Sequence, residues 1–348
     1  MSHVSFQAAV IVEAGKDAAL LRVLAEAITR HRHADGGWGA EPGAMPDAES
    51  TAWALLGSTQ LPSLFEHRAS AEDWLVREQH EGGSWSAFAV TTAATWPTAM
   101  SAWALADSTR NADRRQLAYQ WLSGSRGRQS SVVSRVFQRL LEGREGMRIA
   151  TIDDALTGWP WVDGTASWVE PTSTAILALS AWRESDGSAR DRDAALERVF
   201  RGVDYLCDRQ AAAGGWNYGN TRVLEYELDP FPDTTAWAML ALATGRKVRT
   251  AGKQRESAIR AALDRSVPWL TSSIADAPDT SVLTLALAWH AFDACDAPGP
   301  KATAGQRLRQ ALPDTLDYAR AGYPVADLRA LIASQMVLAE RPLLRSPS

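Results

Sequence analysis

Four acidic residues occupy similar places in the sequence, each a few residues before an apolar segment: Glu49, Glu170, Asp233 and Asp279. An acid at the start of a helix caps free backbone N–H groups and suits the helix dipole, so capping is the simplest role for each of them. If the four segments assemble side by side, the carboxylates instead line one rim. A rim of convergent carboxylates could serve as an acid, a base or a cation site.

The acids belong to a repeated pattern. Gly-Trp turns occur at residues 35–38, 82–85, 158–161 and 214–217, and each precedes an acid or Pro, a Thr, and an apolar segment. The starts of the apolar segments, at 49, 96, 170, 233 and 279, are 47, 74, 63 and 46 residues apart. This spacing is near the period of about 40–50 residues of two-helix repeats, with insertions. Residues 123–147 fill much of the longest gap and are predicted to hold an extra helix.

Two kinds of helix alternate in this pattern. The starts lead into helices that are apolar nearly all round, such as 172–182 and 280–289, and such helices are buried on all sides. Amphipathic helices lie between them, at residues 18–31, 69–79, 111–122, 194–210 and 254–270. The sequence therefore predicts an all-α fold, an α/α toroid of about six helix pairs around a central cavity.

The toroid is expected to form one domain over residues 1–348, because no Pro-, Gly- or Ser-rich linker divides the chain. Its core should span about 18–338. The polar tail at 340–348 is expected to be disordered.

Composition excludes several classes of protein. Of the 348 residues, 46% are hydrophobic and 22% are charged, as in ordinary globular chains. The 36 Lys and Arg against 41 Asp and Glu leave no basic excess for nucleic-acid binding. Two cysteines form neither a disulfide framework nor a Cys/His metal cluster. No apolar run suits a signal peptide or a membrane span, so we expect a cytoplasmic protein.

Tryptophan is used unusually often. The 15 Trp residues outnumber the 6 Tyr and 7 Phe together, which indicates a repeated role for the indole ring.

The Gly-Trp turns resemble the Q-x3-G-x-W repeat of squalene–hopene-type terpene cyclases and of protein prenyltransferase β subunits. Residues 79–85 and 210–216 match it completely, and residues 32–38 match it except at the first position. The resemblance covers roughly residues 20–295 and is closest to short, single-barrel bacterial squalene-cyclase-like proteins. It implies the same α/α toroid.

Zinc chemistry is not expected. Protein prenyltransferases hold zinc with an Asp-x-Cys pair and a later His, whereas this chain has Asp233-Thr234-Thr235 and Asp279 at those places. The missing thiolate is the ligand that zinc activates as a nucleophile. The sequence also lacks an Asp-rich diphosphate motif, so we expect no metal and no cofactor.

The resemblance to class II terpene cyclases implies protonation of an alkene or epoxide by the middle acid of an Asp-x-Asp-Asp-Thr-Ala motif. In the nearest match, residues 47–52, Glu49 takes the place of that acid and Asp47 the place of its partner. Asp233 heads a second, weaker match. These three residues are the candidate catalytic residues, because apolar surroundings keep such an acid protonated.

Candidate substrate-binding residues would line the cavity. Six Trp residues lie on or at the starts of inner helices, where aromatic faces stabilise a carbocation: Trp53, Trp96, Trp103, Trp168, Trp237 and Trp289. Glu170 and Asp279 complete this set at the rim.

These features favour a terpene-cyclase-like enzyme that protonates and cyclises an isoprenoid, an isomerase- or lyase-type reaction. Two alternatives stay open: a barrel that binds an apolar isoprenoid or lipid ligand without this chemistry, and an interaction scaffold whose barrel is filled by side chains. The expected partner is a small apolar molecule and not a nucleic acid. Peripheral membrane contact and the oligomeric state are left open by the sequence.

Overall fold

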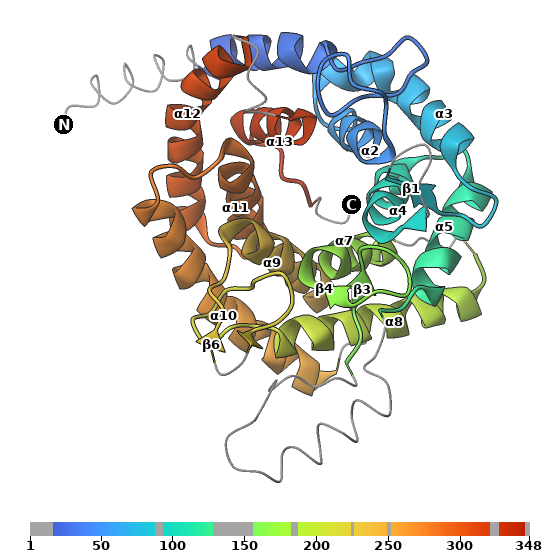
Figure 1. The fold of residues 1–348 in the computed structure, drawn as a ribbon, viewed down its shortest axis with the longest axis vertical. Coiled ribbons are helices and arrows are strands. Elements are labelled where there is room, and N and C mark those ends of the chain that lie inside the picture. Colours follow the sequence, from blue (N-terminus) through green and yellow to red (C-terminus); the bar gives the residue numbers. More distant parts are fainter. Residues whose placement is uncertain are drawn as a thin grey trace.

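The computed structural model describes residues 17–87, 93–127, 156–181, 187–223, 226–248, 252–320 and 327–344. Their helices form two concentric rings (Figure 1). The inner ring consists of α2 (Ala48–Gly57), α4 (Thr95–Ala104), α7 (Val169–Ser180), α9 (Pro232–Arg246), α11 (Val282–Ala294) and α13 (Leu328–Leu338). The outer ring consists of a helix at 17–29, α3 (Arg68–Glu78), α5 (Ala112–Gly124), α8 (Ala189–Asp208), α10 (Lys253–Asp276) and α12 (Pro298–Arg320).

The inner ring is closed. Each inner helix packs against the next one along the chain, and α13 packs against α2, the first of the ring. The predicted α/α toroid of six helix pairs is therefore confirmed. The sixth pair, α12 and α13, lies near the C-terminal end. Most of the predicted extra helix at 123–147 lies outside the described residues, which stop at 127 and resume at 156.

Short elements join the rings. Two 3₁₀ helices, η1 (Pro62–His67) and η2 (Leu105–Asp107), follow α2 and α4. Three antiparallel pairs of two-residue strands lie in the connections: β1 (Trp85–Ser86) with β2 (Ala93–Ala94), β3 (Trp159–Pro160) with β4 (Ser167–Trp168), and β5 (Arg222–Val223) with β6 (Tyr226–Glu227). None of the described helices combines the length and apolar character needed to cross a membrane.

The Gly-Trp turns hold outer and inner helices together. In one of them, the backbone N–H of Trp85 donates to Oγ1 of Thr98 on α4 at 2.9 Å, and its indole N–H donates to the carbonyl of Leu75 on α3 at 2.8 Å. Gly83 takes a φ of +92°, and a Cβ there would collide with the backbone of α5. Gln79 donates to the carbonyl of Gly83 at 3.0 Å. The repeated motif thus links an outer helix, a turn and an inner helix.

The Thr contact recurs in the other three turns. The backbone N–H groups of Trp38, Trp159 and Trp216 donate to Oγ1 of Thr51, Thr172 and Thr235 at 3.0, 2.8 and 2.9 Å. Each Thr lies in the first turn or two of an inner helix. The four turns therefore fix the position along the barrel axis at which four of the inner helices begin.

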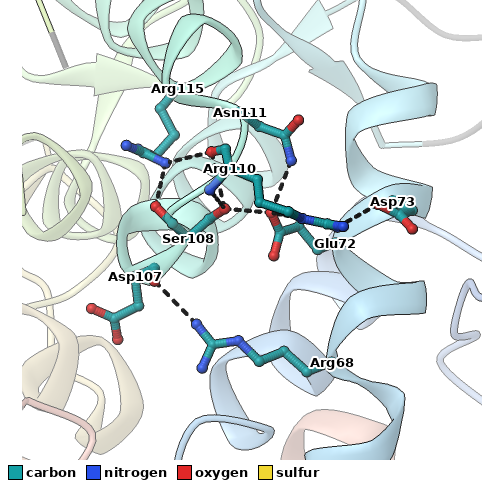
Figure 2. Close-up of polar contacts among 8 residues, drawn as sticks. All are labelled: Arg68, Glu72, Asp73, Asp107, Ser108, Arg110, Asn111 and Arg115. Carbon is teal, nitrogen blue, oxygen red and sulfur yellow. Dashed lines mark hydrogen bonds and ion pairs between the residues drawn. The ribbon is translucent and has the colours of Figure 1, made fainter. Parts of the chain in front are cut away.

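A buried polar cluster fixes the corner between α3 and α5 (Figure 2). Glu72 of α3 is 5% exposed and accepts hydrogen bonds from Nδ2 of Asn111, at 2.8 Å, and from the hydroxyl of Ser108. Arg115 of α5 donates to the carbonyl of Ser108 at 2.6 Å. Asn111 has a φ of 54°, a left-handed conformation that Asn tolerates. The cluster supplies hydrogen-bond partners to the backbone at the point where the chain leaves the inner ring.

The structure differs from the expected disordered tail at residues 340–344. The backbone N–H of Leu343 donates to Nδ1 of His290 on α11 at 3.1 Å, and the Leu343 side chain is 5% exposed. Burial of this leucine against the inner ring offsets the cost of ordering the segment. Residues 345–348 lie outside the described part of the chain.

Candidate functional site

The inner helices begin with a shared arrangement. The second residue of each of these helices, two positions after its N-cap, is Glu49, Trp96, Glu170, Asp233, Leu283 and Arg329 in ring order. All of these except Leu283 interact with one another, as the following contacts show. We call the end of the barrel at which the inner helices begin the mouth.

Glu49 bridges three neighbouring inner helices. Its Oε1 accepts a hydrogen bond from Nη1 of Arg329 on α13 at 2.9 Å, and its Oε2 accepts one from Nε1 of Trp96 on α4 at 3.0 Å. Arg329 also donates through Nη2 to Oδ2 of Asp327 at 2.6 Å. Burial lowers the pKa of Arg329, but the carboxylates of Glu49 and Asp327 outweigh it and raise that pKa. The guanidinium is therefore charged and pairs with the side chain of Glu49.

Glu170 lies in a different environment. Burial raises the pKa of Glu170 to about 7, and the nearby Glu49 and Asp233 carboxylates add to the rise while Arg329 opposes it. Within the described ranges, no hydrogen bond reaches the Glu170 carboxyl group. A pKa near 7 keeps about half of these groups protonated at neutral pH. At neutral pH, the mouth therefore holds a carboxyl group divided about equally between its neutral and charged forms, beside an ion pair.

Asp233 is the third acid of the mouth. Its Oδ1 accepts the backbone N–H of Thr234 at 2.8 Å. Tyr218 lies nearby: burial raises its pKa, and the charges of Asp233 and Glu170 raise it further. Three of the four acids predicted to share one rim, Glu49, Glu170 and Asp233, are thus brought together.

Two pairs of aromatic residues lie at this end of the barrel. The rings of Trp96 and Trp161 meet edge to face, with centroids 5.2 Å apart, and those of Tyr218 and Phe231 lie 4.9 Å apart. Trp168, the N-cap residue of α7, is 36% exposed. Each aromatic pair therefore has one member next to an acid: Trp96 donates to Glu49, and Tyr218 lies near Asp233 and Glu170.

Two further Trp residues meet below the acids. The rings of Trp53 on α2 and Trp237 on α9 are in edge contact, with centroids 6.2 Å apart. Both side chains are buried, with exposed fractions of 1% and 6%. Trp103 lies on α4 seven residues after Trp96, on the same helix face, and is half-buried.

Two of the predicted acids, Asp47 and Asp279, do not share the helix position of Glu49, Glu170 and Asp233. Asp47 is the N-cap of α2 and accepts hydrogen bonds from the backbone N–H and the hydroxyl of Ser50, at 2.8 and 2.7 Å; burial raises its pKa. This is the capping role that the sequence also allowed. Asp279 is exposed in the turn before α11, where Ser281 is the N-cap. Asp279 therefore precedes the helix and does not occupy the position shared by Glu49, Glu170 and Asp233.

Trp289 faces away from the mouth. The ammonium of Lys301 on α12 lies 4.1 Å from the centroid of its ring. Both residues line a cavity of about 570 Å³ between α11, α12 and α13. Trp289 is thus placed between the inner and outer rings.

Sequence reasoning missed Arg329 and Trp161. No Gly-Trp turn precedes α13, so the repeat did not mark its start; the available signal was Asp327, an N-cap before the apolar run of residues 330–338. Trp161 lies in a connection, where helical periodicity says nothing about position. In the part of the chain that the structure describes, no three His, Cys, Asp or Glu residues are grouped as a metal site.

Solved structures with the same architecture include two kinds of enzyme. A variant of the type II terpene cyclase MstE from Scytonema, in complex with its substrate geranylgeranyl dihydroxybenzoate, has a TM-score of 0.57 at 16% identity and covers 96% of this chain and 100% of its own. The GH76A α-1,6-mannanase from Salegentibacter sp. HEL1_6 has a TM-score of 0.53 at 12% identity, covering 92% of this chain and 97% of its own. No protein-family model matches the sequence, and no curated protein sequence does. The chain therefore has the α/α-toroid fold of squalene-cyclase-like enzymes, a fold that the mannanase also adopts.

Proposed function

We propose that this protein is an isoprenoid cyclase that starts its reaction by protonating a carbon–carbon double bond, with Glu170 as the acid. The observation that carries the proposal is the setting of Glu170: a half-buried residue whose carboxyl group has a pKa of about 7 and lies near Tyr218 and the acids Glu49 and Asp233. A general acid must be protonated before it can react, and its pKa should lie near the working pH.

The contacts favour Glu170 over the acids that the sequence singled out. Glu49 is engaged by Arg329 and Trp96, so a proton on it would break an ion pair. Asp47 caps α2. Asp233 is engaged by the backbone N–H of Thr234. We therefore assign the proton transfer to Glu170, and to Glu49 and Asp233 the task of keeping it protonated through their negative charge.

The reaction balances as an isomerisation. The proton of Glu170 forms a C–H bond with one alkene carbon, and the other carbon becomes a cation. The π electrons of the next double bond attack that cation and close a ring, which moves the positive charge along the chain. Loss of a proton to the Glu170 carboxylate ends the reaction and restores the acid.

The surroundings suit a cation. Trp96, Trp161 and Trp168 present indole rings at the mouth, and aromatic faces attract positive charge. The MstE structure supports the choice of ligand, since that protein binds a geranylgeranyl chain within the same architecture.

The test is incubation of the purified protein with geraniol, farnesol, geranylgeraniol and geranylgeranyl dihydroxybenzoate. A product of unchanged mass with one double bond fewer, identified by mass spectrometry and NMR, is the expected result. Glu170→Gln should abolish it, whereas Glu256→Gln, on the exposed outer helix α10, should not. Binding of the isoprenoid without any product would instead identify the barrel as an apolar-ligand binder.

Glycoside hydrolysis is a second candidate, favoured by the exposed rings of Trp168 and Tyr218 at the mouth, which are 36% and 45% exposed. Such rings can stack on sugars, and a protonated carboxyl group beside a carboxylate is the pair that glycosidases use. The mannanase supports this reading, because an inactive variant of it is in complex with α-1,6-mannotriose. Release of reducing sugar from α-1,6-mannan, lost in Glu170→Gln, would replace the cyclase proposal.

A further inference from the structure

We infer that the cavity between α11, α12 and α13 binds an uncharged ligand with several hydroxyl groups, a sugar in its chemical class. This site is separate from the mouth, and the inference does not depend on the proposed function. The cavity has a volume of about 570 Å³, which is typical of small-molecule sites. Its lining residue Trp289 lies six residues after Leu283 on α11, roughly 9 Å along the helix from the mouth.

Three side chains bring hydrogen-bond donors together at this cavity. Trp289 is 4% exposed, and in the part of the chain that the structure describes no acceptor meets its indole N–H. Arg309 binds Asp17 through Nε and Nη2 at 2.9–3.1 Å, and its Nη1 has no partner among the described residues. The ammonium of Lys301 lies 4.1 Å from the centroid of the Trp289 ring. A buried donor without an acceptor is costly, so these donors favour a ligand that supplies oxygen atoms.

Gly305 on α12 keeps the space between two of these donors open. A Cβ at this residue would lie 3.2 Å from Nη1 of Arg309 and 3.3 Å from Nε1 of Trp289. One point beside α12 is therefore close to both donors. Because glycine has no side chain to occupy that space, an oxygen atom of a ligand can enter it and accept from both the guanidinium and the indole.

The charges around the cavity favour an uncharged ligand over an anion. Arg309 is already paired with Asp17 at 2.9 Å. Lys301 is likewise paired with Asp293 at 2.6 Å. Glu340 also lines the cavity and adds another carboxylate. A phosphate or carboxylate ligand would therefore meet no net positive charge.

Hydroxyl groups fit the remaining polar atoms of the lining. Each hydroxyl can accept from the indole or the guanidinium and can donate its own proton to a carboxylate such as that of Glu340. The side chain of Gln306 adds an amide that both donates and accepts, and Ala302 and Val337 add apolar surface. A sugar carries several hydroxyl groups on a frame of C–H groups, so its two kinds of surface match this mixed lining.

Binding is tested by ligand-observed NMR titration of the full chain with D-glucose, D-mannose and D-galactose. Saturable binding of at least one sugar is expected. Its affinity should be the same in about 0.05 M and about 0.5 M NaCl, because salt screens only interactions between charges. Sodium phosphate and sodium acetate are titrated as anionic probes. Tighter binding of either anion than of every sugar would overturn the inference, as would the lack of saturable binding of all three sugars.

Gly305→Ala locates the bound sugar. The added methyl group occupies the space between the Arg309 and Trp289 donors and should weaken the sugar at least tenfold. Gly299→Ala is the matched control on the same helix, because a Cβ at Gly299 has no neighbour within 4 Å. That variant should bind the sugar as the parent does. An equal loss in both variants would contradict the assigned position.

Trp289→Phe tests the indole donor by itself. Phenylalanine keeps an aromatic ring next to Lys301 but lacks the N–H group, so the affinity for the sugar should fall at least threefold. Trp269→Phe makes the same change on α10, which does not line the cavity, and should have no effect. Circular dichroism confirms that each variant is folded, and Trp289→Phe carries the test if Gly305→Ala is not. Unchanged affinity in Trp289→Phe and in a folded Gly305→Ala would place the sugar elsewhere and overturn the inference.

Discussion

Nη1 of Arg329 lies 2.9 Å from Oε1 of Glu49, although 280 residues separate them in the sequence. The contact joins α13, the last inner helix, to α2, the first, at the mouth of the barrel. Ring closure and the charge state of the acidic mouth therefore depend on the same ion pair. Because Arg329 binds Glu49 directly, Glu49 and Glu170 have different surroundings although they occupy equivalent positions of two inner helices.

Arg329→Met is expected to destabilise the protein and to raise the pKa of Glu170. The side chains of Arg329 and Glu49 are 35% and 23% exposed. The free energy of unfolding, measured in urea, should therefore fall by about 1–2 kcal/mol, more than for an exposed ion pair and less than for a fully buried one. The Glu170 pKa should rise because Arg329 is the cation that lowers it. Arg260→Met, in the exposed pair with Glu256, should cost less than about 0.5 kcal/mol. Equal losses in the two variants would contradict a special role for the mouth pair.

Thr98→Val is expected to weaken the junction between a Gly-Trp turn and α4. Valine keeps the shape of threonine but leaves the buried backbone N–H of Trp85 without its acceptor. An unsatisfied buried donor costs about 1–3 kcal/mol, measurable as a lower urea midpoint with an unchanged slope. Thr98→Ser keeps the hydroxyl and should lose less. If serine proves as damaging as valine, the hydroxyl contact is not what stabilises the junction.

Periodicity was sufficient to predict the toroid. Helices such as α7, in which every residue from Pro171 to Leu179 is buried, carry no polar face, and that pattern is visible in the sequence. Three of the four acids could be placed from the sequence, because Glu49, Glu170 and Asp233 share one position before a Thr. The raised pKa of Glu170 was not predictable, since it depends on burial and on the charges of Glu49, Arg329 and Asp233, which come close only when the ring closes.

Capping chemistry explains why Asp279 was misplaced. Asp, Thr and Ser all cap helices, and residues 279–281 contain one of each, so the helix start was ambiguous by three residues. The structure begins α11 at Val282 with Ser281 as cap. The position of Trp289 was similarly undetermined. A helix buried on all sides gives no sign of which face points to the axis, and Trp289 packs toward Lys301 of the outer ring.

Glu170→Gln is expected to stabilise the protein at alkaline pH. The pKa of Glu170 is about 7 in the folded state against its ordinary value of 4.5, so the folded state binds the proton more tightly. Stability should therefore be unaffected by this group below pH 4.5 and should fall as pH rises to 7. Glutamine removes the cost of ionising the half-buried carboxyl group. The free energy of unfolding of the variant should therefore exceed that of the parent by about 1–3 kcal/mol at pH 8 and match it at pH 4. Glu256→Gln, on an exposed pair, should leave the pH dependence of unfolding unchanged; a parallel shift in both variants would argue against a raised Glu170 pKa.

Cyclisation should depend on the protonated form of Glu170. The rate at saturating substrate is expected to be constant well below pH 7 and to fall tenfold per pH unit well above it, because the acid with a pKa of about 7 loses its proton. Glu170→Gln should reduce turnover by a factor of about 10²–10⁴. Asp233→Asn and Glu49→Gln should keep the reaction but move the fall to lower pH, since each removes a negative charge that raises the Glu170 pKa. If Glu49→Gln or Asp233→Asn abolishes turnover while Glu170→Gln does not, the proton comes from one of the acids that the sequence singled out, and Glu170 serves only to bind substrate.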